Sequence, residues 1–184
     1  ERVLTGQPIG KANGFVSANI HSSVTGMVTA VDTFVDSGGL RKPGITIAVE
    51  PDQWYEGIDT TDTIIRVCEM KPEDILTRIA DAGIVGMGGA AFPAHVKLSV
   101  PDGKTVDSLI INGAECEPYL TPDTRLMLER GEEVIIGIKI LARALGVQNL
   151  ALGIQNNQKD PIQHAKKISP FASPCLALSP LYAT

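Results

Sequence analysis

The sequence has few aromatic residues, no excess of basic residues and no long apolar run. The low aromatic share (4%), with 18 glycines and 12 prolines, predicts many tight turns and close backbone approaches. A net charge of -5 with scattered basic residues excludes the basic stripe that phosphate neutralisation in nucleic acids requires. No run reaches the roughly 18 apolar residues of a membrane helix. These features are typical of a globular protein.

The sequence also has few cysteines. They are odd in number and lie far apart, at Cys68, Cys116 and Cys175. This spacing favours a reducing compartment over a disulfide framework. No CxxC pair occurs, so we expect no zinc or iron–sulfur ligand set within this chain. No secretory signal opens the sequence, and "ERVLTGQPIG" looks like the middle of a strand-and-turn module, so we expect a piece of a longer protein.

Residues 1–43 have a β pattern. Apolar and small or polar residues alternate over 14–20 and 25–31, and glycines separate these segments, which predicts a compact barrel or sandwich. "NIHSSVTGMVTAVD" resembles the biotinyl/lipoyl-type barrel-sandwich modules, whose acylated lysine sits at a hairpin tip. Lys11 lies in a different strand context, so we expect a structural or docking module without acylation. Residues 39–44 are predicted to be a connector.

Residues 44–184 combine short apolar strands with helical periods, which predicts an α/β domain with a parallel sheet. Strands are expected over 45–50, 108–114 and 149–154. Helices are expected over 71–82, starting at Pro72 and stopped by Gly83, over 121–131 behind a Thr121 cap, and from 161 onward. A further amphipathic helix over 132–146 should bury one face, composed of Val134, Ile138, Leu141 and Leu145.

One stretch, "GIVGMGGAAFPAHVKL" (83–98), has unusually little side-chain volume. It follows a helix, so it is not the GxGxxG dinucleotide fingerprint, and no lysine–hydroxyl pair follows as in a Walker A loop. Glycines without Cβ atoms allow backbone N–H groups to close on a flat or anionic ligand. Phe92 offers a ring for stacking and Lys97 a cation. A tight turn packed against the sheet is the alternative interpretation.

A second polar stretch, "LIINGAECEPYLTPDTR", leaves a predicted strand at its carboxyl end, where ligands of α/β proteins bind. Asn112 offers donors and an acceptor to a heteroaromatic ring edge. Glu115 and Glu117 place two carboxylates within three residues. Exposed loop acids are usually only solvated, but two acids of this kind together with a glycine loop favour a binding site.

Together the two stretches resemble the RnfC component of the Rnf electron transport complex, which is related to the NADH-binding flavoprotein subunit of respiratory complex I. The resemblance spans roughly 40–167, and the barrel-sandwich module also fits this family. It implies a Rossmann-like, parallel-sheet domain that binds flavin and NADH over 44–184, preceded by the β module of 1–43. It also implies FMN and NAD(H) as cofactors, with 4Fe–4S clusters outside this chain.

Site residues follow from the resemblance by position, because the relatives have "GLRGRGGAGFPTGLKW" and "NADExEPG" at these places. Two residues would contact NADH: Phe92 and Glu117. Six would contact FMN: Gly86, Gly88, Gly89, Lys97, Asn112 and Glu115. Met87 replaces an arginine of the relatives and Ala114 replaces an aspartate, so the flavin contacts are expected to be fewer or differently arranged.

The tail, 169–184, does not resemble the family's continuation, which leads to a "YPxGGE"-type loop of the flavin site. The resemblance implies a peripheral subunit on the cytoplasmic face of the bacterial inner membrane, with the other Rnf subunits, NADH and, indirectly, ferredoxin as partners. Electrons would pass between NAD(H) and ferredoxin, coupled to ion transport. Two alternatives remain: a flavin-dependent cobalamin reductase of microcompartments, and a binding or scaffold module without flavin.

Overall fold

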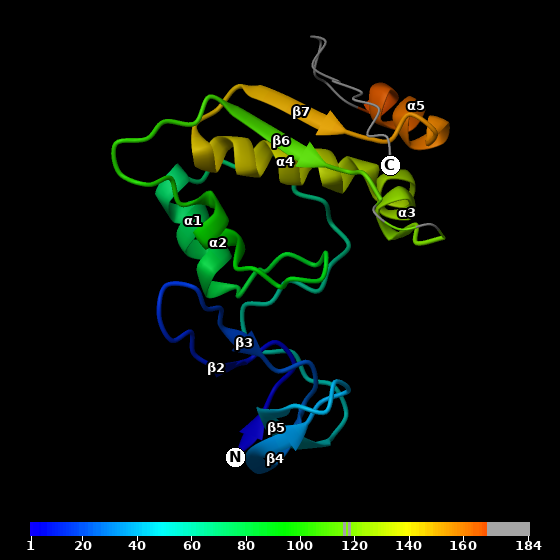
Figure 1. Cartoon of the computed structure of the whole chain (residues 1–184). Helices are drawn as coiled ribbons and strands as arrows, with labels where there is room; N and C mark the ends of the chain where they lie inside the picture. The colour runs from blue at the N-terminus through cyan, green and yellow to red at the C-terminus, as the bar shows by residue number, and fades with distance from the viewer. Residues whose placement is uncertain (116, 118, 169–184) are drawn as a thin grey trace. The chain divides into compact units, whose positions relative to one another are not determined.

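A computed structural model describes residues 1–115, 117 and 119–168 of the chain. The chain divides into two compact units, whose elements are labelled in Figure 1. The first unit comprises residues 1–62 and 78–96, and the second comprises residues 63–77 and those from 97 onward. None of the helices in the described ranges is both long and apolar enough to span a membrane. The predicted departure at 169–184 lies outside the described residues.

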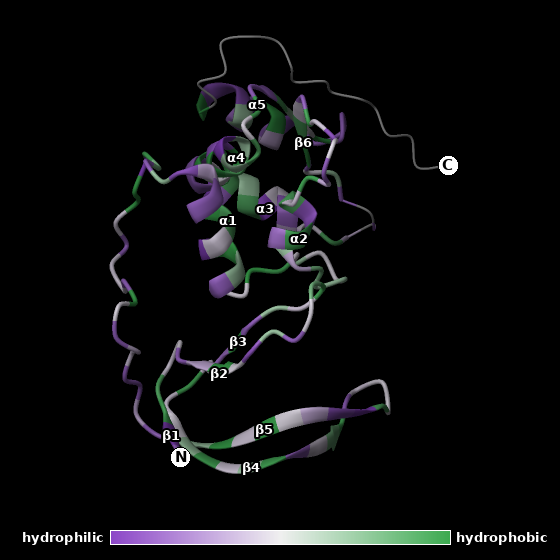
Figure 2. Cartoon of the chain, turned by 90° about the vertical axis from the view of Figure 1, so that its left-hand side faces the viewer, coloured by the Kyte–Doolittle hydropathy of each residue, from purple (hydrophilic) through white to green (hydrophobic). Residues whose placement is uncertain are grey.

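The first unit contains the predicted β structure. Strands β1 (Arg2–Val3), β4 (Gly26–Val35) and β5 (Arg41–Val49) form an antiparallel sheet in the order β1-β4-β5. Strands β2 (Pro8–Gly10) and β3 (Ile20–His21) form a separate antiparallel pair. Figure 2 shows β4 and β5 as a long two-stranded ribbon. At its base a Cβ on Gly26 would lie 2.2 Å from the Ala48 carbonyl oxygen, so the strands require glycine there.

Two expectations for this unit are wrong. Residues 14–19 form no strand, and β3 contains only the last residue of the predicted segment. Side chains bond the backbone there instead: Asn19 Oδ1 accepts from the Ala12 N–H at 2.9 Å and Ser17 Oγ from the Asn13 N–H at 3.0 Å. Such local bonds compete with strand pairing. The predicted connector 39–44 belongs to β5 from Arg41 on, so β5 runs across the predicted division between 43 and 44.

A buried threonine pair fixes the chain that follows β5. Thr25 is fully buried and Thr5 is 7% exposed, and their hydroxyl oxygens lie 3.0 Å apart. Thr25 Oγ1 accepts from the Gln53 N–H at 2.9 Å and donates to the Gln53 carbonyl at 2.8 Å. Thr5 Oγ1 donates to Asp52 Oδ1 at 3.0 Å. Both threonine hydroxyls therefore have hydrogen-bond partners, as burial of a polar group requires.

The second unit contains the predicted parallel pair. Strands β6 (Ser108–Asn112) and β7 (Asn149–Gly153) pair in parallel from Ser108↔Asn149 to Asn112↔Gly153. Helices α3 (Pro122–Glu129) and α4 (Gly131–Leu145) connect them, and α5 (Lys159–Ile168) follows β7. Figure 1 shows α4 running alongside the two strands. The mixed α/β class is confirmed, but the described sheet of this unit has two strands and does not show a Rossmann-like arrangement.

Helices α1 (Pro72–Asp81) and α2 (Ala94–Leu98) flank the glycine-rich stretch. As predicted, α1 begins at Pro72, whose fixed φ and missing N–H suit the first helical position. It ends before Gly83, which adopts a φ of +64°. The Ile84 N–H donates to the Ile79 carbonyl at 3.1 Å and closes the last turn. The glycine-rich stretch therefore starts from a properly terminated helix.

The core of the second unit lies between the strands and the last helices. It consists of buried residues of α3, of β7 and the residue after it, and of α5, with Ile111 of β6 packed against them: Met127, Leu152, Ile154, Ile162 and Ala165. On α4 the buried face differs from the predicted one, and only Ile138 is common to both. The apolar residues buried there are Ile135, Ile138, Ala142 and Ala144. Because α4 packs against both α3 and α5, its inner face is rotated from the predicted stripe.

The sequence predicts that Gly131 ends the helix over 121–131, and this is wrong. Gly131 is the first residue of α4, and Arg130 separates α3 from α4. A Cβ on Gly131 would lie 2.6 Å from Ile168 Cδ1 and 3.0 Å from the His164 ring. The glycine is therefore explained by the close approach of α5 to the start of α4. At the other end, Gly146 adopts the left-handed conformation that ends helices.

Candidate functional site

The glycine-rich loop between α1 and α2 is a short closed hairpin in the first unit. The Gly86 N–H donates to the Phe92 carbonyl and the Ala94 N–H to the Ile84 carbonyl, each at 2.9 Å. Val85 and Pro93 form an antiparallel bridge between these bonds. Residues 87–91 form the exposed tip. The hydrogen-bonded neck therefore presents a bare backbone tip to solvent.

The glycines of this stretch differ in whether neighbouring atoms would exclude a Cβ at their positions. A Cβ on Gly83 would lie 2.2 Å from the Asn19 carbonyl oxygen, so packing within the unit requires glycine there. At Gly88 and Gly89 a Cβ would meet no heavy atom within 4 Å, and at Gly86 only the Phe92 carbonyl oxygen at 3.8 Å. Internal packing does not account for these three glycines. Gly89 has a backbone reason instead, a φ of +109°, and at Gly86 and Gly88 the missing Cβ leaves the backbone open to solvent.

Backbone geometry at the tip also departs from ordinary loops. Gly89 has a φ of +109°, and Ala91, which carries a Cβ, has a φ of +48°. The left-handed conformation is unfavourable for alanine, and such residues cluster at ligand-binding sites. Phe92 follows directly and is 39% exposed. Its ring is accessible for the predicted stacking role.

Lys97, the predicted cation, belongs to α2 and to the second unit. Its side chain is exposed, whereas the next residue, Leu98, is buried and anchors the helix. A lysine on such a short helix is held by its neighbour's packing. It offers a solvated positive charge.

The carboxyl end of β6 is formed by Asn112, Gly113 and Ala114. Asn112 Oδ1 accepts from the Ala114 N–H at 3.1 Å, and the Gly113 N–H donates to the Gly153 carbonyl of β7 at 2.8 Å. A Cβ on Gly113 would lie 3.2 Å from both Met127 Sδ and the Gly153 oxygen. Asn112 therefore turns the chain, and Gly113 permits close packing at this strand end.

Glu115 has a role that the sequence does not predict, because it caps α3. Its Oε1 accepts from the Thr124 N–H, the third residue of the helix, at 2.9 Å. Thr121, the predicted cap, makes no side-chain capping bond. A carboxylate at a helix N-terminus also interacts favourably with the helix dipole. The Glu115 side chain, predicted to line the flavin site, therefore holds the loop to α3.

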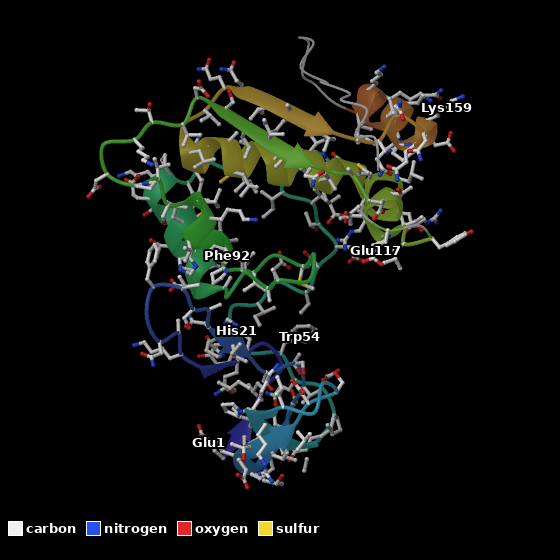
Figure 3. All side chains as sticks on the ribbon, in the orientation of Figure 1. Glu1, His21, Trp54, Phe92, Glu117 and Lys159 are labelled. Carbon is white, nitrogen blue, oxygen red and sulfur yellow. The ribbon has the colours of Figure 1, made fainter. Side chains whose placement is uncertain are left out.

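Glu117 is the exposed carboxylate of this loop. Figure 3 labels it on the loop that precedes α3. Its carbonyl accepts from the Leu120 N–H at 3.3 Å, which forms a turn there. Tyr119, within this turn, is fully exposed with a φ of +67°. Unlike Glu115, Glu117 is available to a ligand.

Gln155 is a residue at this strand end that the sequence does not single out. It follows β7, and its Nε2 donates to the Glu115 carbonyl at 2.7 Å. The sequence contains a clue, because parallel strands end at the same edge of a sheet, so residues after β7 lie beside residues after β6. A single glutamine outside any motif carries no local signal of such a contact.

The predicted residues are thus distributed over both units. Four belong to the first unit: Gly86, Gly88, Gly89 and Phe92. The other four belong to the second unit, in which the structure brings Asn112 and Glu115 to one strand end: Lys97, Asn112, Glu115 and Glu117. Two hollows, of about 440 Å³ beside β2 and about 300 Å³ beside α4, are lined by other residues.

The charged groups of the second unit whose pKa values are shifted are not among the predicted site residues. In the second unit, hydrogen bonds from the Arg130 guanidinium lower the pKa of Glu133. Glu132, which accepts two bonds from Arg66, raises the pKa of that arginine. These exposed pairs stabilise the surface only weakly. They contribute nothing to the predicted site.

Comparison with known families accounts for both units. Residues 79–172 match the Nuo51 FMN-binding domain, and residues 1–53 match the RnfC barrel sandwich hybrid domain. The first match covers half of the chain and includes all eight predicted site residues. The chain belongs to the RnfC family. The RnfC match also confirms the barrel-sandwich class of the β module.

Curated relatives of this RnfC-family chain include the C subunits of three bacterial complexes. That of the Na(+)-translocating ferredoxin:NAD(+) oxidoreductase complex of Acetobacterium woodii is 41% identical over 89% of this chain. Its proton-translocating counterpart from Clostridium ljungdahlii is 43% identical over 91%. That of the ion-translocating oxidoreductase complex of Rhodobacter capsulatus is 48% identical over 88%. The alignments cover 36%, 36% and 31% of these relatives, so the chain spans about a third of their length.

Proposed function

We propose that this chain is the flavin- and NADH-binding part of a membrane-associated electron transport subunit. The subunit passes electrons between NAD(H) and ferredoxin through FMN, and this transfer is coupled to ion transport. The observation that supports this most directly is the occurrence of the RnfC barrel module and the Nuo51 FMN-binding domain in one chain. The names of the three relatives favour this function over the cobalamin reductase alternative.

The glycine loop fits FMN on structural grounds. Gly88 and Gly89 leave open the space that Cβ atoms would fill, so their backbone can approach a flat ring or a phosphate. Gly86 belongs to the neck that holds the tip in shape. Lys97 would neutralise the negative charge of the nucleotide, and Asn112 and the loop around Glu115 would contact the ring or ribityl side. When bound, FMN supplies the conversion of hydride transfer into single-electron transfer.

Phe92 and Glu117 are proposed to bind NADH. Phe92 offers its ring for stacking, and the exposed carboxylate of Glu117 is a hydrogen-bond acceptor for the amide or hydroxyl groups of a nucleotide. The protein's part in the reaction is to orient the two nucleotides. 4Fe–4S clusters carried by the remainder of the subunit, and the other Rnf subunits at the cytoplasmic face of the membrane, would receive the electrons.

Two variants of the full-length subunit test this assignment. We expect Lys97→Ala to lower FMN affinity roughly ten- to hundredfold, because a charge-assisted hydrogen bond contributes about 1.5–3 kcal/mol. We expect Glu117→Gln to leave flavin content nearly unchanged and to raise KM for NADH or slow flavin reduction. Flavin absorbance measures the first effect, and NADH-driven reduction of an artificial acceptor measures the second.

The wild-type subunit is the control for both variants, and it should contain FMN that NADH bleaches under anaerobic conditions. A colourless wild-type subunit would favour the scaffold alternative. If the two variants lost flavin equally, or if neither changed in either assay, the residue assignment would be wrong although the family membership would stand.

A further inference from the structure

Gln155 connects the two strand ends of the second unit through a side chain. Its Nε2 lies 2.7 Å from the Glu115 carbonyl oxygen, and both residues are half-buried. Gln155 follows β7, whereas Glu115 follows β6, 40 residues earlier. The bond therefore fixes a loop by means of a distant part of the chain.

Glu115 is held from three directions. Its carbonyl accepts from Gln155, and its carboxylate accepts from the Thr124 N–H at the start of α3. On its amino-terminal side, the Gly113 N–H is bonded to the Gly153 carbonyl at 2.8 Å. Backbone pairing and the helix cap are local to β6, β7 and α3. The Gln155 bond determines where the Glu115 peptide group points, because it is made to that group itself.

We propose that Gln155 is a positioning residue for the loop that carries Glu117, and that it thereby controls binding of the nucleotides. This inference rests on the proposed function. Gln155 acts through the Glu115 carbonyl, two residues before Glu117, and not through contact with a nucleotide. An oriented Glu115 peptide group sets the course of the chain toward Glu117, and restricted freedom of a binding loop raises affinity.

The side-chain amide of Gln155 is suited to this role. A primary amide donates through its nitrogen, whereas a carboxylate of the same size only accepts and would face the Glu115 carbonyl as a second acceptor. Gln155→Glu therefore keeps the volume and removes the donor. Loss of one neutral hydrogen bond corresponds to about a three- to tenfold weaker affinity when the freed loop must be ordered on binding.

The test uses the full-length subunit with Gln155→Glu and Gln155→Ala. The matched control is Asn157→Ala, because Asn157 is an exposed residue of the same turn. We would measure backbone hydrogen exchange of the peptide over 108–124, the Kd for FMN by fluorescence titration, and KM and kcat for NADH. We expect both Gln155 variants to exchange faster over this peptide and to bind FMN about three- to tenfold more weakly. KM for NADH should rise more than kcat falls.

Each outcome decides a separate point. Unchanged exchange over 108–124 in Gln155→Glu would overturn the anchoring role, whether or not flavin binds. Faster exchange with unchanged FMN affinity and unchanged KM would overturn the role in nucleotide binding. Equal effects in Asn157→Ala would assign the change to the turn as a whole and overturn the role of Gln155. A wild-type subunit that binds no FMN would contradict the proposed function, while hydrogen exchange would still decide the anchoring.

Discussion

At the scale of single residues, Thr25 is the polar residue of the first unit whose substitution we expect to lower the free energy of unfolding most. It is fully buried, and its hydroxyl oxygen accepts from the N–H groups of Thr5 and Gln53. Thr25→Val keeps the shape of the side chain and leaves the Gln53 N–H without its acceptor, whereas the Thr5 N–H keeps the Gln53 carbonyl at 3.1 Å. We expect a loss of about 1–3 kcal/mol in the free energy of unfolding. Urea unfolding followed by the fluorescence of Trp54, the one tryptophan of the sequence, measures this.

The matched control for this prediction is Thr29→Val. Thr29 lies on β4, which begins directly after Thr25; it is exposed and donates to the Thr46 carbonyl at a longer 3.3 Å. We expect a change below about 0.5 kcal/mol, as for most surface substitutions. Equal losses of unfolding free energy in the two variants would show that the buried hydroxyl of Thr25 stabilises the unit no more than an exposed one.

At the scale of elements, the turn between β4 and β5 depends on one aspartate. Asp36 Oδ1 accepts from the N–H groups of Gly38 and Leu40, each at 2.9 Å, and Oδ2 pairs with Lys42 at 2.6 Å. The Lys42 bond is the main cause of the lowered pKa of Asp36, and the two backbone bonds add to it. A lowered folded-state pKa means that this contribution is present above the unfolded pKa and is lost as pH falls through the folded value.

We therefore expect the amides of Gly38 and Leu40 to lose protection only below about pH 4, where an ordinary aspartate becomes protonated. Amide hydrogen exchange or NMR between pH 2 and pH 6 would measure this. Asp36→Asn retains an acceptor oxygen and removes the titration, so the pH dependence at these amides should disappear. A dependence that persisted in Asp36→Asn would assign it to another group.

Two glycines of α4 form a matched pair for the packing of α5. A Cβ on Gly131 would collide with Ile168 and the His164 ring, whereas a Cβ on Gly137 would meet nothing within 4 Å. We expect Gly131→Ala to destabilise the second unit by about 1–3 kcal/mol. Gly137→Ala should stabilise it by about 0.5–1 kcal/mol, because alanine is the better helix former. Denaturant unfolding distinguishes them, and equal shifts of the same sign would contradict the close approach of α5.

The elements differ in how well the sequence predicts them. The start of α1 and the end of α4 follow from Pro72 and Gly146, because these residues act through their own backbone. The failed strand at 14–19 could not be excluded in this way, since alternating small residues fit a strand as well as a loop bonded by its own side chains. The α3 cap and the buried face of α4 depend on partners distant in sequence, which a local pattern does not contain.

At the scale of the whole molecule, the sequence proposes candidate residues by their positions in two motifs, but it does not contain the contacts that each residue makes. Glycine content alone does not separate Gly83, which packs against Asn19, from Gly88, which faces open space. Similarly, adjacent carboxylates do not show that Glu115 caps a helix while Glu117 stays exposed. These distinctions arise from tertiary contacts.

We expect the isolated 184-residue chain to bind FMN weakly or not at all, and the full-length subunit to bind it firmly. The proposed binding residues on the described chain are largely exposed, including Gly88, Lys97, Asn112 and Glu117. Small-molecule sites normally bury about 70–90% of their ligand, which exposed residues alone do not achieve. Equilibrium dialysis of both proteins against FMN measures the difference. An isolated chain that retained stoichiometric flavin after dialysis would contradict this.

The parallel pairing of β6 with β7 also means that β6 is synthesised well before its partner strand. Asn112 ends β6 and Asn149 begins β7, so the ribosome adds 37 residues (149 − 112) after Asn112 to reach the first residue of β7. At about 5–20 residues per second, this takes roughly two to seven seconds. During that interval the nascent β6 has no β7 to pair with, so the N–H and C=O groups of its pairing edge have no partner strand. Helices α3 and α4 are synthesised in the same interval, so all of their residues are joined to the chain before those of β7, the strand that completes the parallel pair.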